Sequence, residues 1–157
     1  MVGRLKALGK TLALAESCTA GLVADLIARV SGASKVFWGS FVTYTQDAKI
    51  KMLAIPEELI KKYGEVSEAV ALAMAEGALE KSGASLAVSV TGLAGPSGDG
   101  SNTPVGTVWI GFAGRDERVR ETKMFHFNGS RDEVRKAAAA IVLEKVWKHI
   151  DNKEDFV

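Results

Sequence analysis

Several residue types that mark particular kinds of site are scarce in this chain of 157 residues. It has one cysteine, Cys18, and two histidines, His126 and His149. A single cysteine excludes an internal disulfide and a multi-cysteine zinc site, and it fits a reducing compartment. Neither histidine has a second ligand at metal spacing, so we expect no metal and no cofactor, and a structural role for both. Hydrolytic chemistry would then more readily use lysine than histidine as its base.

Excess charge and long apolar runs are also missing. The chain has 20 lysine and arginine residues and 19 aspartate and glutamate residues, which gives a formal net charge of +1. Nucleic-acid binders normally carry a clear basic excess. The most apolar stretches, 86–88 and 141–143, are far shorter than the roughly 18 residues of a membrane span. No apolar core of a signal peptide follows the charged start 1–6. We therefore expect a cytoplasmic protein without nucleic-acid or membrane partners.

The length favours one domain over 1–157, with 151–157 as a frayed tail. Hydrophobic spacing, caps and turn residues predict alternating elements. Helices are expected over 2–9, 18–30, 46–53, from Pro56, 67–81 and 130–150, and strands over 11–15, 36–44, 86–91, 105–113 and 119–127. The polar turn 114–118 joins the last two strands into an antiparallel hairpin. This order predicts an α/β domain whose mixed sheet is covered by helices.

Ser17 follows a buried strand and precedes a predicted helix, where open α/β sheets usually bind ligands. Free backbone N–H groups at a helix start would support a nucleophile that develops negative charge. A serine in this place is also a common helix cap, and both interpretations remain open. Cys18 is more naturally a small buried residue than a nucleophile.

Lys49 falls in the opening turn of the helix predicted after Tyr44, with Thr45 as its cap. The helix dipole disfavours an ammonium group there, and a lysine acts as a general base only when it is neutral. Asp47 would oppose that effect. Spacing alone favours a solvated surface lysine, like Lys51.

Two further segments are candidates for ligand binding. The glycine-rich loop 91–100 follows a strand, and its backbone amides could approach a ligand closely, although a mobile connection explains it equally well. Ser130 and Glu133 form an S-x-x-E capping box at the start of the last helix. Arg131 in that first turn would make a phosphate site, or would pair with Asp132 or Glu133 on the surface.

Taken together, these segments resemble the CinA C-terminal domain family, whose enzymatic members are nicotinamide-nucleotide amidohydrolases. The matching strings are AESCTAG (15–21), VTYTQDAK (42–49), GEVSE (64–68), VSVTGLAGPSG (88–98), PVGTVW (104–109) and GSR (129–131). The resemblance implies a three-layer α/β/α sandwich in the stand-alone form, without the N-terminal domain of fused members. It also implies deamidation of nicotinamide mononucleotide, a small-molecule nucleotide, to nicotinate mononucleotide.

By this resemblance Ser17 is the nucleophile, Lys49 its partner, and Tyr44 and Ser34 supply supporting hydroxyls. The residues expected to contact substrate, through side chains or backbone amides, are Thr19, Thr91, Gly92, Gly95, Ser130 and Arg131. Three positions depart from the family pattern, namely Ala20 for a second glycine, Ser97 for an aspartate and Thr103 for a lysine.

Two alternatives stand beside the amidohydrolase. One is a non-catalytic nucleotide-binding or regulatory module on the same fold, and the other is an amidohydrolase for a different amide. We also expect a homodimer, with Trp109 or Trp147 in its interface if they are exposed.

Overall fold

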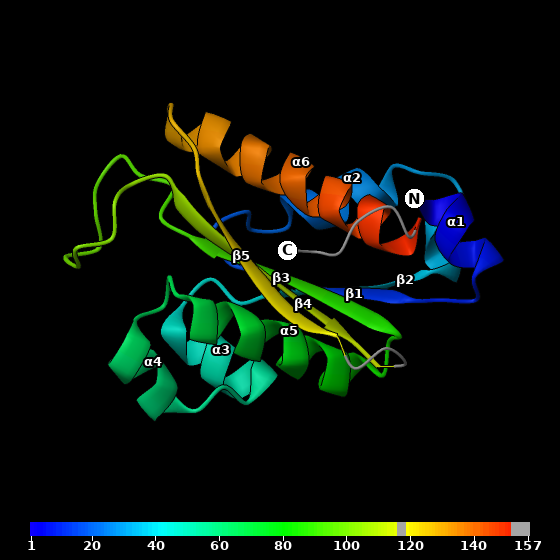
Figure 1. Ribbon diagram of the computed structural model, residues 1–157, viewed down its shortest axis with the longest axis horizontal. Coiled ribbons are helices and arrows are strands. Elements are labelled where there is room, and N and C mark those ends of the chain that lie inside the picture. The colour runs from blue at the N-terminus through cyan, green and yellow to red at the C-terminus, as the bar shows by residue number, and fades with distance from the viewer. Residues whose placement is uncertain (116–118, 152–157) are drawn as a thin grey trace.

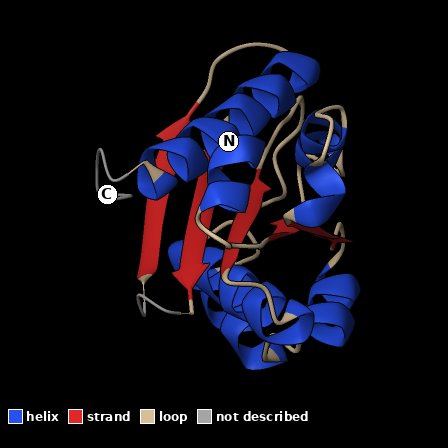
Figure 2. Cartoon of the chain, turned by 90° about the vertical axis from the view of Figure 1, so that its right-hand side faces the viewer, coloured by secondary structure: helices blue, strands red, loops and turns tan. Residues whose placement is uncertain are grey.

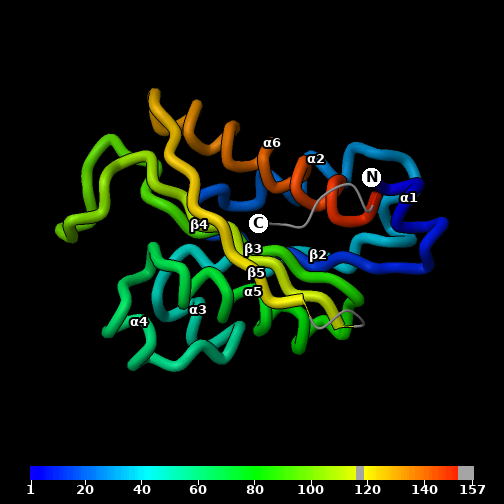
Figure 3. The backbone as a smooth tube through the Cα atoms, in the orientation of Figure 1, coloured from blue at the N-terminus to red at the C-terminus, as the bar shows by residue number. Residues whose placement is uncertain are grey.

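The computed structural model describes residues 1–115 and 119–151. In this part of the chain one five-stranded sheet lies between two layers of helices (Figure 1). One layer holds α1 (Val2–Ala7), α2 (Leu22–Ala28) and α6 (Arg131–Ile150), and the other holds α3 (Gln46–Leu53), α4 (Glu57–Tyr63) and α5 (Glu68–Ser82) (Figure 3). A short 3-10 turn, η1 (Ala33–Lys35), precedes the second strand. The predicted three-layer α/β/α sandwich is confirmed.

The sheet is mixed, with strand order β2-β1-β3-β4-β5. Helices cover both of its faces (Figure 2). Its strands are β1 (Leu12–Glu16), β2 (Phe37–Val42), β3 (Leu86–Gly92), β4 (Thr107–Gly114) and β5 (Arg120–His126). The first three are parallel, while β4 is antiparallel to β3 and to β5. The predicted hairpin is therefore confirmed by its pairing, although residues 116–118 of its turn lie outside the described residues.

Capping explains where several helices begin. Thr45 and Ser67 accept hydrogen bonds from the amides of Ala48 and Val70, at the starts of α3 and α5. The capping box at the start of α6 is present as predicted. Most of the predicted tail, 152–157, lies outside the described residues.

Each helical layer buries its own core against the sheet. Leu14, Val88, Ile110 and Val142 belong to the core under α2 and α6, and the core under α5 is built largely from alanine. Small side chains let α5 approach the sheet so closely that a Cβ atom at Gly111 would collide with a backbone carbonyl of that helix. This close packing leaves the ends of the strands as the place where loops can form a cavity.

The surface gives few indications of partners. Among the described residues no helix is long and apolar enough to cross a bilayer. Trp147 is 38% exposed and Trp109 is half-buried, while Trp38, which was not singled out, is 52% exposed on the edge strand β2. The homodimer stays a prediction.

Candidate functional site

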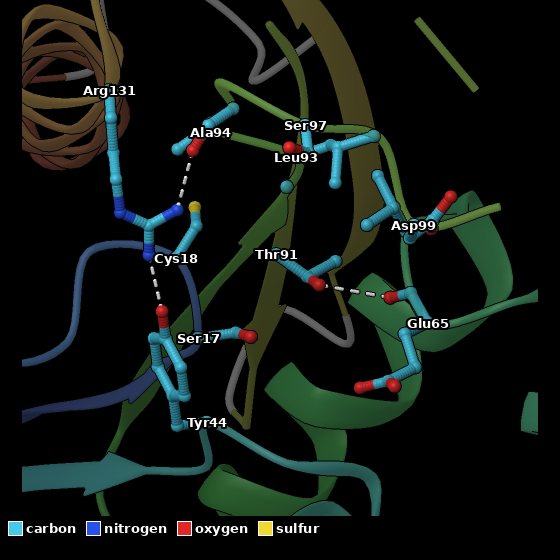
Figure 4. A pocket seen from close by; sticks show the side chains of 13 residues that line it. Ser17, Cys18, Tyr44, Glu65, Thr91, Leu93, Ala94, Ser97, Asp99 and Arg131 are labelled. Atoms are coloured by element: carbon cyan, nitrogen blue, oxygen red, sulfur yellow. Dashed lines mark hydrogen bonds between the residues drawn. The ribbon is translucent and has the colours of Figure 1, made fainter. Parts of the chain in front are cut away.

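A cavity of about 200 Å³ opens at the carboxyl ends of β1 and β3 (Figure 4). It is bordered by the turn after β1, the segment after β2, the segment before α5, the loop after β3 and the start of α6. The residues that line it include Ser17, Cys18, Tyr44, Glu65, Thr91, Gly92, Gly95, Ser97, Asp99 and Arg131. Six of the ten predicted site residues therefore line one pocket, at the end of the sheet where a ligand site was expected.

Lys49 contacts residues of this pocket although its own side chain is buried. Its side chain, 1% exposed, runs from α3 toward the turn after β1, and Nζ donates a hydrogen bond to Ser17 Oγ at 3.2 Å. The interpretation of Lys49 as a solvated surface lysine is therefore wrong. Spacing could not reveal this because it does not say which face of a short helix meets the sheet.

Glu65 completes a charged pair that the sequence did not reveal. Its Oε2 lies 2.7 Å from Lys49 Nζ, and its side chain is 40% exposed in the pocket. The Thr91 hydroxyl donates to the Glu65 carbonyl at 2.9 Å, which fixes the segment before α5 to the end of β3. Glu65 lies within the matched string GEVSE, but nothing in its spacing indicates a partner 16 residues away.

The turn that carries Ser17 is organised by Glu16 and not by the helix start. We expected a helix from residue 18, but α2 begins at Leu22, so Ser17 is not its cap. The fully buried Glu16 carboxylate lies at the start of α2 instead, and it accepts five hydrogen bonds at 2.8–3.1 Å. The donors are the hydroxyls of Thr19 and Ser40 and the amides of Gly21, Val23 and Ala24.

Glu16 thereby satisfies backbone amides that a helix start leaves free, and it holds the chain between Ser17 and α2 in one conformation. An acidic residue just before a helix was a usable signal in the sequence. It was overlooked because the helix was placed too early.

Two arginines of α6, one helical turn apart, connect the remaining loops. Arg131 donates to the Gly95 carbonyl at 2.8 Å and to the Tyr44 hydroxyl (Figure 4). Arg135 donates to the carbonyls of Cys18 and Thr19 at 3.1 and 2.9 Å. Arg131 thus lines the pocket, where its guanidinium connects the loop after β3 to the segment after β2. Arg135 was not predicted, because its role depends on how α6 packs.

Three predicted residues lie away from the pocket lining. Ser34 is exposed in η1, which precedes β2 and so lies at the opposite end of the parallel strands. Thr19 is fully buried, and its hydroxyl donates a hydrogen bond to the Glu16 carboxylate. Ser130 is an exposed helix cap whose hydroxyl is engaged by Glu133. The structure does not bring these three side chains to the pocket.

The pocket also holds a thiol and a further carboxylate. Burial raises the pKa of the Cys18 thiol to about 11, with the nearby Glu16 charge adding to the effect, so this thiol is protonated at neutral pH. Hydrogen bonds from the hydroxyl and amide of Ser101 hold the pKa of Asp99 below its usual range. Across residues 1–115 and 119–151, no group of three or more histidine, cysteine or acidic side chains is arranged to hold a metal ion.

Comparison with known proteins agrees with the strings noted above. A family model described as the CinA C-terminal domain matches residues 1–150. The chain belongs to the CinA C-terminal domain family. Among CinA-family structures, the competence/damage inducible protein CihA from Agrobacterium tumefaciens superimposes with a TM-score of 0.89 at 38% identity, covering 96% of this chain and 90% of that one.

Relatives in the CinA family differ in length. The chain is 46% identical over 145 residues to the nicotinamide-nucleotide amidohydrolase PncC of Escherichia coli (strain K12), covering 92% of this chain and 87% of that protein. It is 49% identical over 136 residues to the CinA-like protein of Geotalea daltonii, covering 86% of this chain but 32% of that protein. This chain therefore spans most of some CinA relatives and about a third of others.

Proposed function

We propose that this chain hydrolyses the carboxamide of nicotinamide mononucleotide, giving nicotinate mononucleotide and ammonia. The observation that carries the proposal is the contact between Lys49 Nζ and Ser17 Oγ at 3.2 Å, beside a pocket that Arg131 also lines. The name of the 46% identical Escherichia coli relative supplies the substrate class. The pocket offers a hydroxyl nucleophile, a base and an anion-binding cation, which are the groups that amide hydrolysis of a nucleotide needs.

In the proposed acylation step, Lys49 in its amine form accepts the Ser17 proton while Ser17 Oγ attacks the carboxamide carbon. A C–O bond forms, and the carbonyl oxygen becomes an oxyanion. Backbone N–H groups at Cys18 and Thr19, or in the turn 91–95, are the candidates to stabilise it. The Ser17 amide is not one of them, because it donates to the Val90 carbonyl at 2.9 Å. The Lys49 ammonium then protonates the leaving nitrogen, ammonia departs, and water hydrolyses the acyl-enzyme.

Arg131 is proposed to bind the phosphate, with the amides at the start of α6 beside it. A guanidinium suits a phosphate because its N–H groups match two phosphate oxygens at once. Binding would require Arg131 to exchange at least one of its present acceptors, Tyr44 or Gly95, for the phosphate. Tyr44 lines the same pocket and accepts a hydrogen bond from Arg131, so it is proposed to help orient the substrate.

Ammonia release from nicotinamide mononucleotide by the purified chain tests the proposal. Ser17→Ala and Lys49→Met should each lower the rate by about 10²–10⁴-fold while the thermal melt stays that of a folded protein. Ser31→Ala and Lys51→Met, the same changes at exposed positions outside the pocket, should retain the wild-type rate. Binding of the mononucleotide without ammonia release would contradict the proposal and favour a non-catalytic module. Release from other amides only would assign a different substrate.

A further inference from the structure

Within the described residues Lys49 Nζ donates hydrogen bonds to two side chains, and only one of them is the proposed nucleophile. Its Nζ atom lies 3.2 Å from Ser17 Oγ and 2.7 Å from Glu65 Oε2. The shorter contact is to the Glu65 carboxylate, which the sequence analysis did not predict as a site residue and which has no role in the proposed acylation step. A carboxylate at that distance acts on Lys49 both as an anchor and as a charge.

We propose that Glu65 is a positioning residue that holds Lys49 Nζ against Ser17 and also keeps Lys49 in its ammonium form, so that catalysis rises only as the medium becomes alkaline. This inference rests on the proposed function only for its activity readout. The contact itself belongs to the structure whatever the substrate is.

The segment that carries Glu65 is fixed on both sides. Gly64 ends α4 with φ +80°, and Ser67 caps α5 while its hydroxyl donates to the Gly64 carbonyl at 2.9 Å. The buried Thr91 hydroxyl holds the Glu65 carbonyl at 2.9 Å. Because the backbone is held at these three points, the Glu65 side chain is directed into the pocket, as Figure 4 shows. This geometry is what an anchor for Lys49 requires.

The charge effect follows from what else surrounds Lys49. The ionisable groups that face it or share its pocket come from six parts of the chain, namely Glu16 of β1, Cys18 after it, Tyr44 after β2, Glu65 before α5, Asp99 after β3 and Arg131 of α6. Asp99 accepts two hydrogen bonds from Ser101. Glu16 is engaged by five donors, and the Cys18 thiol is protonated at neutral pH because its pKa is raised to about 11. Tyr44 and Arg131 hydrogen-bond to each other. Glu65 therefore supplies the negative charge in contact with Lys49, and an opposite charge favours the ammonium form.

The pH profile of kcat/KM for ammonia release separates these two roles. In Glu65→Gln the amide oxygen can still accept a hydrogen bond from Lys49, but the charge is gone. The ascending limb should therefore move at least one pH unit lower, and kcat/KM at pH 7 should rise about tenfold, since one unit changes the amine fraction tenfold. Glu65→Ala should show the same shift together with a plateau about tenfold lower than that of Glu65→Gln, because the anchor is lost.

Glu68→Gln is the matched control. It removes the same charge three residues away, from an exposed carboxylate that accepts a hydrogen bond from Thr122 and does not line the pocket. Its profile should coincide with that of the wild type. A limb that does not move in Glu65→Gln, or that moves equally in Glu68→Gln, would overturn the charge-setting role. Equal plateaus for Glu65→Ala and Glu65→Gln would overturn the anchoring role.

A second readout does not need the substrate. The ¹³Cε signal of Lys49, assigned by its loss in Lys49→Met, reports the pH at which the amine loses its proton. This midpoint should fall by at least one pH unit in Glu65→Gln and should stay unchanged in Glu68→Gln. If no variant releases ammonia from the mononucleotide, the proposed function fails, while this titration still decides whether Glu65 sets the charge of Lys49. An unchanged midpoint in Glu65→Gln would refute the inference about Glu65 alone.

Discussion

Lys49 Nζ lies 3.2 Å from Ser17 Oγ, although 32 residues separate the two along the chain. The contact exists because β1 and β2 are parallel neighbours, so the turn after β1 and the helix after β2 emerge at the same edge of the sheet. The Lys49 side chain and the Ser17 hydroxyl meet there, and water is largely excluded on the Lys49 side. This pair connects the fold to the proposed chemistry.

Glu16 is expected to stabilise the fold as well as the turn at Ser17. In Glu16→Gln the amide N–H₂ group would replace either Oε1, which accepts from two donors, or Oε2, which accepts from three, and the charge near the start of α2 would be lost. We expect the free energy of unfolding to fall by about 2–4 kcal/mol, as for other buried polar groups that lose a partner. Urea unfolding at pH 7 measures it. Glu58→Gln, at a side chain 84% exposed, is the control and should change stability by less than about 0.5 kcal/mol.

Ala20 has φ +49°, in the left-handed region that favours glycine. The side chain is exposed, so replacing it removes strain without leaving a cavity. Ala20→Gly should therefore stabilise the fold by about 0.5–1 kcal/mol. Ala140→Gly, the same change at an exposed position within α6, should instead cost about 1 kcal/mol. A thermal melt in which both variants shift in the same direction would contradict this account of Ala20.

Arg131 is expected to contribute to binding through the phosphate. Arg131→Met should raise KM for nicotinamide mononucleotide by at least tenfold, because a charge-assisted contact to a phosphate is lost. For nicotinamide riboside, which has no phosphate, KM should change by less than threefold. The ratio of the two KM values is the quantity to measure. An equal loss for both substrates would mean that Arg131 acts by holding Tyr44 and Gly95 and not by binding phosphate.

Cys18 should be an unreactive thiol despite its place beside Ser17. With a folded-state pKa of about 11 against an ordinary 9.0, its thiolate fraction at pH 8 is about 100-fold below that of the unfolded chain. Iodoacetamide labelling followed by mass spectrometry should be slower in the native protein by at least that factor, with protein in urea as the reference. Because the pKa is raised on folding, this burial stabilises the fold below pH 9.0, and the contribution is lost as the pH rises toward 11. Rapid native labelling would show that the thiol is ionised.

Much of the fold followed from local signals in the sequence. Caps at Thr45, Ser67 and Ser130 and the polar turn after β4 act through residues a few positions apart, so they can be read without the tertiary structure. The helix after Ser17 is the exception. A helix is expected from residue 18, whereas Gly21 and the Glu16 carboxylate delay its start to Leu22.

The site was predictable in its location and only partly in its members. Three of its residues lie at the ends of predicted strands or helices, where a binding site is expected from the sequence, namely Ser17, Tyr44 and Arg131. Glu65 and Arg135 act only through long-range packing, and the burial of Lys49 depends on which face of α3 meets the sheet. Ser34, whose role is implied by the resemblance alone, lies at the opposite end of the parallel strands from the pocket.

The two arginines of α6 have a consequence for how the pocket is assembled during protein synthesis. Arg131 and Arg135 hold groups that lie 36 to 117 residues earlier in the chain. The ribosome therefore releases the turn after β1 and the loop after β3 long before the side chains that join them exist. The pocket therefore stays unfinished until translation has passed residue 135.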